Sequence, residues 1–386
     1  MPDSYVKIDL AALEHNARIL TTKYSEYKHF IGVVKGDAYG HGYEAVNALQ
    51  KGGVDYFAVS SLEEAKALRE HNKEVSVLCL QPVSLDRLDE AKALELTLAI
   101  GDTDYLKRFI ILTKNNKFKV HQQIDTGFNR LGFKDQKEIK EAYDTLTQNG
   151  HTVEGIYQHF ATAGVFDPHF DEQAKRFVEL TSLLDLSSIP MVHMGSGVAL
   201  LGHGKFPFAN TTRMGLVMYG YNIAPTSYGG GMKNKLREYR DGYYRRKYRL
   251  SPVNKDVALD LIPAMTFKTR VIQTKTVKAG EYIGYDCAYQ AKEDMKIAVL
   301  PVGYNNGIGR QDFGRVVEIG EKLFPVVGEI GMNMLCVKVD DSIKTDDEVT
   351  LLGGEITLGM FSRSSGLGLA EALVGIGKNN VRIHNS

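Results

Sequence analysis

Several polar side chains of this sequence stand where short apolar segments end, and their types suggest a site for an anionic ligand. Lys35 closes the apolar segment FIGVV, His159 closes EGIYQ, and Ser196 follows MVHMG. Lysine is costly to bury, so its position at the end of a buried segment suggests a chemical role. Each residue alone has an ordinary structural explanation, such as a solvated lysine or a turn serine. Their recurrence at segment ends favours a common site.

Eight short apolar segments carry or precede these residues. They span 30–36, 55–61, 75–81, 97–102, 118–126, 152–160, 190–196 and 213–220. Amphipathic segments such as LDRLDEAKALEL and FDEQAKRFVELTSLLDL separate most of them. Short apolar strands that alternate with amphipathic helices indicate a parallel sheet covered on both faces. Eight such units are the number that closes a (β/α)8 TIM barrel, and an open doubly wound sheet is the alternative.

The catalytic groups of such a barrel lie at the carboxyl ends of its strands. Lys35, Arg130 and His159 would then meet at one rim, which gives that rim two cations and an imidazole. Ser196 ends the seventh strand, and Arg213, Gly215 and Leu216 open the eighth. Loops after these two strands commonly hold a phosphate. A lysine beside a phosphate-binding loop suggests a Schiff base with pyridoxal phosphate.

The sequence pattern changes after residue 224. Residues 226–250 are basic and rich in tyrosine, and from residue 264 onward the chain is rich in β-type segments such as AMTFKTRVIQTKTV and KIAVLPVGY. Long helical periods are missing there except near LGLAEALVGIG. We therefore expect a barrel over 11–224 and a mostly antiparallel β domain over 225–386, with the early strand at 5–10 joining the second domain.

Composition excludes several classes of protein. Lys+Arg and Asp+Glu both number 47 among 386 residues, and a net charge of zero argues against a general polyanion binder. The basic, tyrosine-rich segment 226–250 could bind single-stranded nucleic acid, but a surface insertion explains it better. The three cysteines lie too far apart for a disulfide framework or a zinc site and fit a reducing cytoplasm. No apolar segment reaches the roughly 18 residues of a membrane span, so we expect neither membrane nor nucleic-acid partners.

Eight motifs in fixed order carry a resemblance to a known family. They are VVKGDAYGHG, DTGFNRLG, HFATA, HMGSG, RMGLVMYG, GYDCAY, PVGYNNG and VGEIGMN, and they extend over nearly the whole chain. Together they resemble the bacterial alanine racemases, which are pyridoxal-phosphate enzymes with a (β/α)8 barrel and a C-terminal β domain. The resemblance implies interconversion of L-alanine and D-alanine for peptidoglycan synthesis. It also implies a homodimer whose active sites are shared between subunits.

The resemblance implies two catalytic residues, Lys35 and Tyr285. Inversion of a stereocentre needs an acid and a base on opposite faces. Lys35 would carry the cofactor and serve one face, and Tyr285 of the partner subunit would serve the other. Tyrosine is a poor base at its reference pKa of about 10. A chain through His159 to Arg213, which would donate to the pyridine nitrogen, could favour the phenolate.

The other implied roles concern binding. Tyr39, Ser196 and the backbone of Gly215 and Leu216 would bind the phosphate. Arg130 would hold the cofactor's phenolic oxygen and the substrate carboxylate. Met332 and Tyr304, both from the β domain of the partner subunit, would line the substrate site.

Some positions depart from the family pattern and leave the substrate open. The family often has a carbamylated lysine where this chain has Gln123, whose amide oxygen could still accept a hydrogen bond from Arg130. Further departures are Gly195, Glu329, Asn333 and Lys378. A serine or broad-specificity racemase is therefore the nearest alternative. A barrel-type decarboxylase would place an acid where this chain has Arg213, and a non-enzymatic cofactor-binding protein would consist of the barrel alone.

Overall fold

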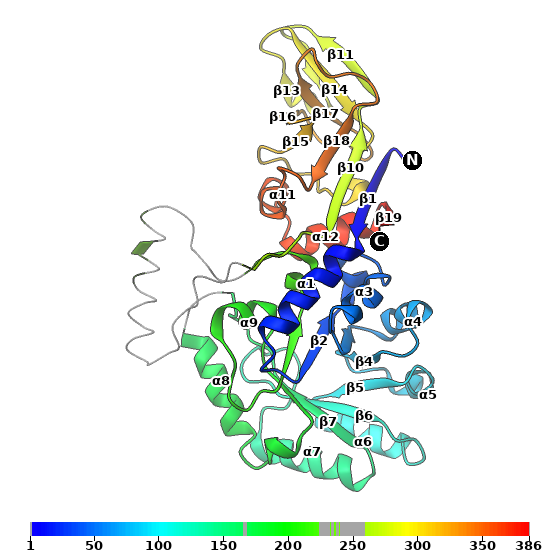
Figure 1. Ribbon diagram of the computed structural model, residues 1–386, viewed down its shortest axis with the longest axis vertical. Helices are drawn as coiled ribbons and strands as arrows, with labels where there is room; N and C mark the ends of the chain where they lie inside the picture. Colours follow the sequence, from blue (N-terminus) through cyan, green and yellow to red (C-terminus); the bar gives the residue numbers. More distant parts are fainter. Residues whose placement is uncertain are drawn as a thin grey trace. The chain divides into compact units, whose positions relative to one another are not determined.

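The computed structural model describes residues 2–164, 168–223 and 259–385, together with Met232, Lys235, Leu236 and Tyr239. The chain forms two compact units (Figure 1). The β unit comprises Met1–Leu13, Gly36–Ala48 and Ile262–Ser386, and the barrel unit comprises Glu14–Lys35 and Leu49–Leu261. The expected domain boundaries, 11–224 and 225–386, stay a prediction. The segment 226–250 lies outside the described residues except at those four single positions.

Eight parallel strands form the closed barrel of the barrel unit, paired in sequence order. They are β2 (His29–Val33), β3 (Tyr56–Val59), β4 (Ser76–Cys79), β5 (Leu96–Ile100), β6 (Lys119–Gln123), β7 (Thr152–Tyr157), β8 (Met191–His193) and β9 (Thr211–Met214). The last strand closes the barrel by pairing with the first, with Thr211 opposite His29. Every residue of β3 and β5 is buried, as expected for strands covered on both faces. The predicted barrel is thus confirmed, and the open sheet is excluded.

Amphipathic helices alternate with the barrel strands (Figure 1). They are α1 (Leu10–Lys23), α3 (Ala45–Lys51), α4 (Leu62–His71), α5 (Leu88–Ala93), α6 (Thr103–Leu112), α7 (Gln136–Gln148), α8 (Pro168–Leu180) and α9 (Gly197–His203), with 3-10 turns η1 (Leu85–Arg87), η2 (Leu186–Ser188) and η3 (Leu216–Tyr219). Ser61, Asp102 and Asp135 cap α4, α6 and α7 by accepting backbone N–H groups, which stabilises the helix starts.

A nine-stranded sheet dominates the β unit, in the order β11-β14-β17-β16-β15-β18-β10-β1-β19. Its strands are β1 (Ser4–Asp9), β10 (Met265–Arg270), β11 (Gln273–Val277), β14 (Met295–Leu300), β15 (Val316–Ile319), β16 (Lys322–Val327), β17 (Leu335–Val339), β18 (Glu348–Leu352) and β19 (Val381–Asn385). All its pairings are antiparallel except β1 with β19. The early strand of the sequence, β1, pairs with β10 in this sheet. The expected antiparallel β architecture is confirmed.

Smaller elements complete the β unit. They are α2 (Lys35–Tyr39, of which Lys35 belongs to the barrel unit), β12 (Tyr282–Ile283), η4 (Tyr285–Cys287), β13 (Tyr289–Gln290), η5 (Tyr304–Asn306), α11 (Leu358–Ser365) and α12 (Leu369–Lys378). The segment LGLAEALVGIG forms α12 as the sequence predicts, whereas α11 was not expected. Thr357 caps α11 by accepting the N–H of Met360, and Gly366 ends it with a left-handed φ of 69°.

The strand ends differ from expectation at three places. The strand expected over 213–220 ends at Met214, because Gly215 (φ −123°, ψ −116°) turns the chain into η3. Arg213 therefore lies inside a strand, with Gly215 and Leu216 after it. His159 lies two residues beyond the end of β7, and Ser196 lies three residues beyond β8. These residues stand in the loops at the carboxyl ends, not in the strands themselves.

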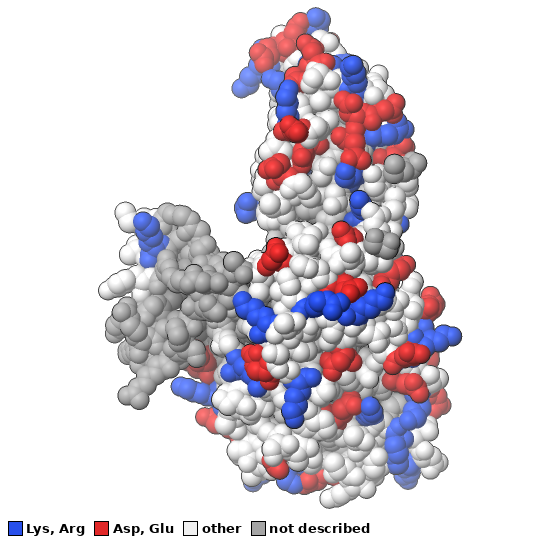
Figure 2. Space-filling view, viewed as in Figure 1, with Lys and Arg blue, Asp and Glu red and all other residues white. Residues whose placement is uncertain are grey.

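The visible surface carries both signs of charge. Lys and Arg side chains alternate with Asp and Glu over the described parts of both units in Figure 2. Within the described ranges, none of the helices combines the length and the apolar character needed to span a membrane. The same residues contain no group of three or more His, Cys, Asp or Glu side chains placed to hold a metal ion.

Candidate active site

The backbone that follows Lys35 is left-handed. Positive φ angles occur at five consecutive residues: Gly36 (68°), Asp37 (59°), Ala38 (50°), Tyr39 (54°) and Gly40 (83°). Three of these carry side chains, and a left-handed conformation costs such residues roughly 1–2 kcal/mol each. Strain of this kind persists only where surrounding contacts impose it, and it concentrates at functional sites.

Contacts within the β unit hold this left-handed turn. Arg382 of β19 forms an ion pair with Asp37. The backbone of Gly40 lies so close to α12 that a β-carbon on Gly377 would overlap the carbonyl of Gly40. Buried His41 contacts the carbonyl oxygen of Ala38 through its Nδ1 at 3.0 Å. Because glycines allow this close approach, the helix and the turn fix each other.

The Lys35 side chain is half-buried at the end of β2. Burial lowers the pKa of its amine, and the charges of Arg130 and Arg213 lower it further against the opposing effect of Glu64. A lowered pKa raises the fraction of neutral amine, which is the nucleophilic form. The barrel unit therefore places a half-buried amine among cations, and its chemical role stays a prediction.

Arg213 lies inside the barrel, where only 4% of its surface is exposed. Its Nη1 donates to Nδ1 of His193 at 2.7 Å and to the His193 carbonyl at 3.1 Å. Its Nη2 contacts the Gln158 carbonyl at 2.8 Å, His159 Nδ1 at 3.2 Å and the Met194 carbonyl at 3.3 Å. Within the described part of the chain, its Nε–H has no acceptor. The guanidinium thus keeps one fixed donor unused.

His159 lies against Arg213 and remains neutral. Burial lowers its pKa to about 3, and the charges of Arg213, Arg130 and Lys35 act in the same direction. Since Arg213 can only donate, Nδ1 of His159 accepts and the ring proton resides on Nε2. The ring centroid of His159 is 5.3 Å from that of Phe128, over which the exposed Arg130 guanidinium sits at 4.3 Å.

Three donors lie together beside the start of α9. Ser196 precedes this helix, and its hydroxyl makes no capping hydrogen bond. A β-carbon on Gly197 would lie 3.6 Å from the backbone nitrogen of Gly215. The N–H of Leu216 begins η3 and so has no acceptor within its own turn. A hydroxyl and backbone N–H groups at such positions suit an anion such as a phosphate.

Three further residues expected at the site gather on the surface of the β unit. Tyr285 of η4 is 66% exposed, Met332 is 54% exposed and Tyr304 of η5 is 40% exposed. The N–H of Tyr304 donates to the carbonyl of Gly331 at 3.0 Å, and a β-carbon on Gly331 would lie 3.6 Å from the Tyr285 ring. These contacts place both tyrosines beside the loop that carries Met332. Tyr39 is half-buried in the left-handed turn of the same unit.

Two of the departures from the family pattern, Gln123 and Glu329, have defined side-chain partners. Gln123 is buried, and its amide oxygen accepts from the Tyr157 hydroxyl at 3.0 Å, so the contact expected with Arg130 is not among its hydrogen bonds. Glu329 forms an ion pair with Arg310 at 2.8 Å. Sequence reasoning missed His193, which contacts Arg213 more closely than any other side chain. His193 is the first residue of the HMGSG motif, three residues before Ser196, and this position is the signal that could have been used.

The fold is a (β/α)8 barrel whose carboxyl-end rim carries a half-buried Lys35 near Arg130 and Arg213, and enzymes of this barrel class hold their catalytic groups at that rim. The family model for the alanine racemase N-terminal domain matches residues 8–223, and that for the alanine racemase C-terminal domain matches residues 264–384. Alanine racemase from Streptococcus pneumoniae serotype 19F (strain G54) is 31% identical over 349 residues, which cover 90% of this chain and 87% of the relative.

Solved structures agree with these matches. Alanine racemase from Clostridium difficile 630 aligns with a TM-score of 0.85 at 27% identity and covers 100% of this chain and 96% of its own. The enzyme from E. faecalis aligns with a TM-score of 0.85 at 27% identity, over 99% and 98% of the two chains. The chain belongs to the alanine racemase family. Because both domain models match, it is more than a barrel alone.

Proposed function

We propose that this protein interconverts L-alanine and D-alanine by exchange of the α-proton and so supplies D-alanine for peptidoglycan. Family membership supports the reaction. The observation that supports this reaction at these residues is that the barrel unit holds two such groups. One is a half-buried Lys35, whose amine has a lowered pKa, and the other is a buried Arg213, whose Nε–H has no acceptor among the described residues. We further propose a cytoplasmic location, which the free thiols of all three cysteines support.

Pyridoxal phosphate is the cofactor that we propose. The barrel unit has groups that fit its aldehyde, its phosphate and its ring nitrogen. The amine of Lys35 suits its aldehyde. The Ser196 hydroxyl and the N–H groups of Gly215 and Leu216 suit its phosphate, to which Tyr39 would contribute from the left-handed turn. The unused Nε–H of Arg213 suits its ring nitrogen. When bound, this cofactor withdraws electrons from the substrate's α-carbon and makes the α-proton removable.

The protein's own groups would then move the proton. Lys35 would take or return a proton through Nζ on one face of the substrate, and Tyr285 would do so through its hydroxyl on the opposite face. Burial lowers the pKa of Arg213 to about 10, so the guanidinium stays protonated at neutral pH and donates a hydrogen bond without surrendering its proton. Keeping the ring nitrogen unprotonated weakens electron withdrawal and limits side reactions. Arg130 would hold the substrate carboxylate.

A homodimer follows from the same proposal. Tyr285, Tyr304 and Met332 are large side chains that are all exposed on one side of the β unit, and exposed apolar groups in a cluster mark interaction sites. We propose that they enter the active site of the partner subunit, where Tyr285 faces Lys35. Each site would then need both subunits.

Proton exchange in deuterated water tests this function. The purified protein is incubated with L-alanine or D-alanine, and chirality and α-deuterium are scored. We expect each enantiomer to give the other with deuterium at the α-carbon. Parallel incubations with L-serine and D-serine separate a strict alanine racemase from a broad-specificity one, and release of carbon dioxide would point to a decarboxylase. Absence of α-deuterium from both amino acids would contradict the proposal.

A further inference from the structure

A row of buried polar side chains continues from Arg213 through the interior of the barrel. We call this row, which consists of Arg213, His193, His121 and Glu154, the histidine file. Nε2 of His193 on β8 lies 2.8 Å from Nδ1 of His121 on β6, and both imidazoles are fully buried. Nε2 of His121 lies 3.6 Å from a carboxylate oxygen of Glu154 on β7. The Tyr157 ring stacks on His193 at 4.8 Å between centroids. Two imidazoles thus join a buried cation to a carboxylate that the cation does not touch.

The chemistry of these groups fixes the direction of every hydrogen bond in the file. Arginine has only donors, so Nδ1 of His193 accepts and its ring proton resides on Nε2. That proton is donated to Nδ1 of His121, which places the His121 proton on Nε2, 3.6 Å from the nearest Glu154 oxygen. At this separation the contact with Glu154 is electrostatic and not a hydrogen bond. Burial lowers the pKa of both histidines, so both rings stay neutral. Either ring in its other tautomer would set two N–H groups against each other.

Glu154 remains an anion at the far end of the file. Burial raises the pKa of its carboxyl, but His121, Lys119 and Tyr56 together lower it to about 2. Lys119 lies 2.9 Å from one oxygen, and the Tyr56 hydroxyl donates to the other at 2.7 Å. Thr97 donates to that second oxygen at 3.3 Å. The carboxylate therefore has three side-chain donors, and the buried His121 imidazole lies beyond them at 3.6 Å.

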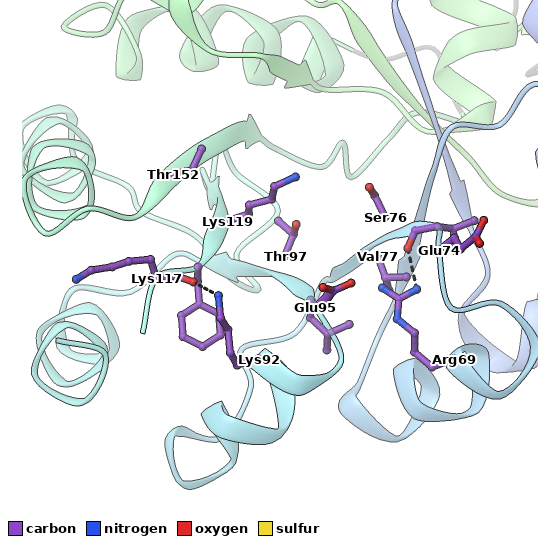
Figure 3. A pocket seen from close by; sticks show the side chains of 13 residues that line it. Arg69, Glu74, Ser76, Val77, Lys92, Glu95, Thr97, Lys117, Lys119 and Thr152 are labelled. Atoms are coloured by element: carbon purple, nitrogen blue, oxygen red, sulfur yellow. Dashed lines mark hydrogen bonds between the residues drawn. The ribbon is translucent and has the colours of Figure 1, made fainter. Parts of the chain in front are cut away.

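The far end of the file meets a cavity of about 390 Å³ at the opposite rim from the active site. The cavity is bounded by the first residues of four consecutive strands, β4 to β7, and Lys119 and Thr97 line it with Glu95 (Figure 3). Catalysis in barrels of this type takes place at the carboxyl ends of the strands, so this cavity is not the reaction site. Its position instead leaves the outer side of the Lys119–Glu154 pair near solvent.

We propose that Glu154, acting through neutral His121 and His193, is the counter-anion of Arg213 and a positioning residue that holds its guanidinium with Nε–H directed to the cofactor site. This proposal rests on the proposed function only for the identity of that cofactor. The direction in which the hydrogen bonds of the file are donated depends on residues of the barrel unit alone. A buried cation without a touching carboxylate needs such compensation, and hydrogen-bonded networks in a low dielectric carry it well.

The test is nitrogen-15 NMR of the histidine rings in the full-length protein, with His121 and His193 assigned from single histidine variants. We expect both rings to be neutral with the proton on Nε2. Finding either ring cationic, or with its proton on Nδ1, overturns the proposal. This measurement needs no catalysis, so it stands even where the racemase activity fails.

Variants of Glu154 distinguish the effect of its hydrogen-bond acceptor oxygen from the effect of its negative charge. Glu154→Met removes both; Arg213 still sets the His121 tautomer through His193, and we expect the Nε2–H signal of His121 to shift because it loses the nearby carboxylate. Glu154→Gln keeps an acceptor oxygen, and we expect a smaller shift. Lys119→Met, at the same cavity, is the matched control and should leave both rings unchanged. In the racemase assay we expect Glu154→Met to lower kcat about tenfold with little change in KM, as loss of an orienting partner does elsewhere. Unchanged His121 and His193 signals in Glu154→Met overturn the proposal, and if that variant does not fold, the wild-type tautomers decide.

Discussion

Replacement of Gly155 by alanine probes how tightly the barrel holds the histidine file. Gly155 lies on β7, and a β-carbon there would be 2.6 Å from Nδ1 and Cε1 of the His121 ring, whereas ordinary contact begins at 3.4 Å. The ring is fully buried and hydrogen-bonded to His193, so it has little room to retreat. Overpacking of a core costs about 1–3 kcal/mol, and loss of a hydrogen bond adds about 1 kcal/mol. We expect Gly155→Ala to lower the free energy of unfolding by about 2–4 kcal/mol.

Urea unfolding followed by circular dichroism measures this change. Gly164→Ala is the matched control in the same unit, because a β-carbon there would be 3.8 Å from Val198 and the backbone has no left-handed φ. We expect this control to change stability by no more than about 0.5–1 kcal/mol. Equal urea midpoints for Gly155→Ala and Gly164→Ala would show that the His121 ring has room to move, and would refute the close packing on which the calculation depends.

Four other expectations concern the active site, its turn and pH. Lys35→Ala should abolish the visible absorbance of the protein-bound cofactor; a spectrum like that of the wild type would count against Lys35 as the attachment point. Tyr285→Phe should keep that absorbance and abolish exchange from one enantiomer only, and full exchange from both would remove Tyr285 from the mechanism. Gly377→Ala should destabilise the β unit, because its β-carbon would overlap the Gly40 backbone. Gly359→Ala should not, because a β-carbon there would come no closer than 3.4 Å to another atom. Equal urea midpoints for the two variants would contradict this expectation. The folded-state pKa of Glu154 is about 2, below its ordinary value, so the carboxylate stabilises the fold at neutral pH and loses this contribution as pH falls toward 2. The difference in free energy of unfolding between wild type and Glu154→Gln should therefore narrow as pH falls. A difference that stays constant with pH would show that the charge of Glu154 contributes nothing to stability.

The sequence predicts the barrel well because each barrel strand is recognisable from the residues within the strand itself. Segments such as FIGVV and LTLAI are buried on both faces, so they read as continuous apolar runs at strand length. The ends of these segments locate Lys35, His159 and Ser196 at one rim without any knowledge of their neighbours. Helix starts at Ser61, Asp102 and Asp135 follow from the same local rules.

The remaining features depend on contacts between distant parts of the chain. Nothing in the residue types of Asp37, Ala38 and Tyr39 predicts a left-handed turn, which exists because Arg382 and the glycines of α12 impose it. Likewise, His121 and His193 are 72 residues apart, and only closure of the barrel brings their rings together. The strand predicted over 213–220 was wrong beyond Met214 because an apolar run alone does not distinguish a strand from the 3-10 turn that Gly215 starts.

Subunit complementation tests most directly the central claim that an amine and a phenol from different subunits share one site. Lys35→Ala and Tyr285→Phe proteins are each assayed alone, then mixed, dissociated and reassembled. In a hybrid dimer, one site would carry both defects and the other neither. Since half of the random dimers are hybrids, we expect about a quarter of the wild-type activity to return. No recovery in a mixture that demonstrably contains hybrid dimers would mean that Lys35 and Tyr285 act within one subunit, which contradicts the account.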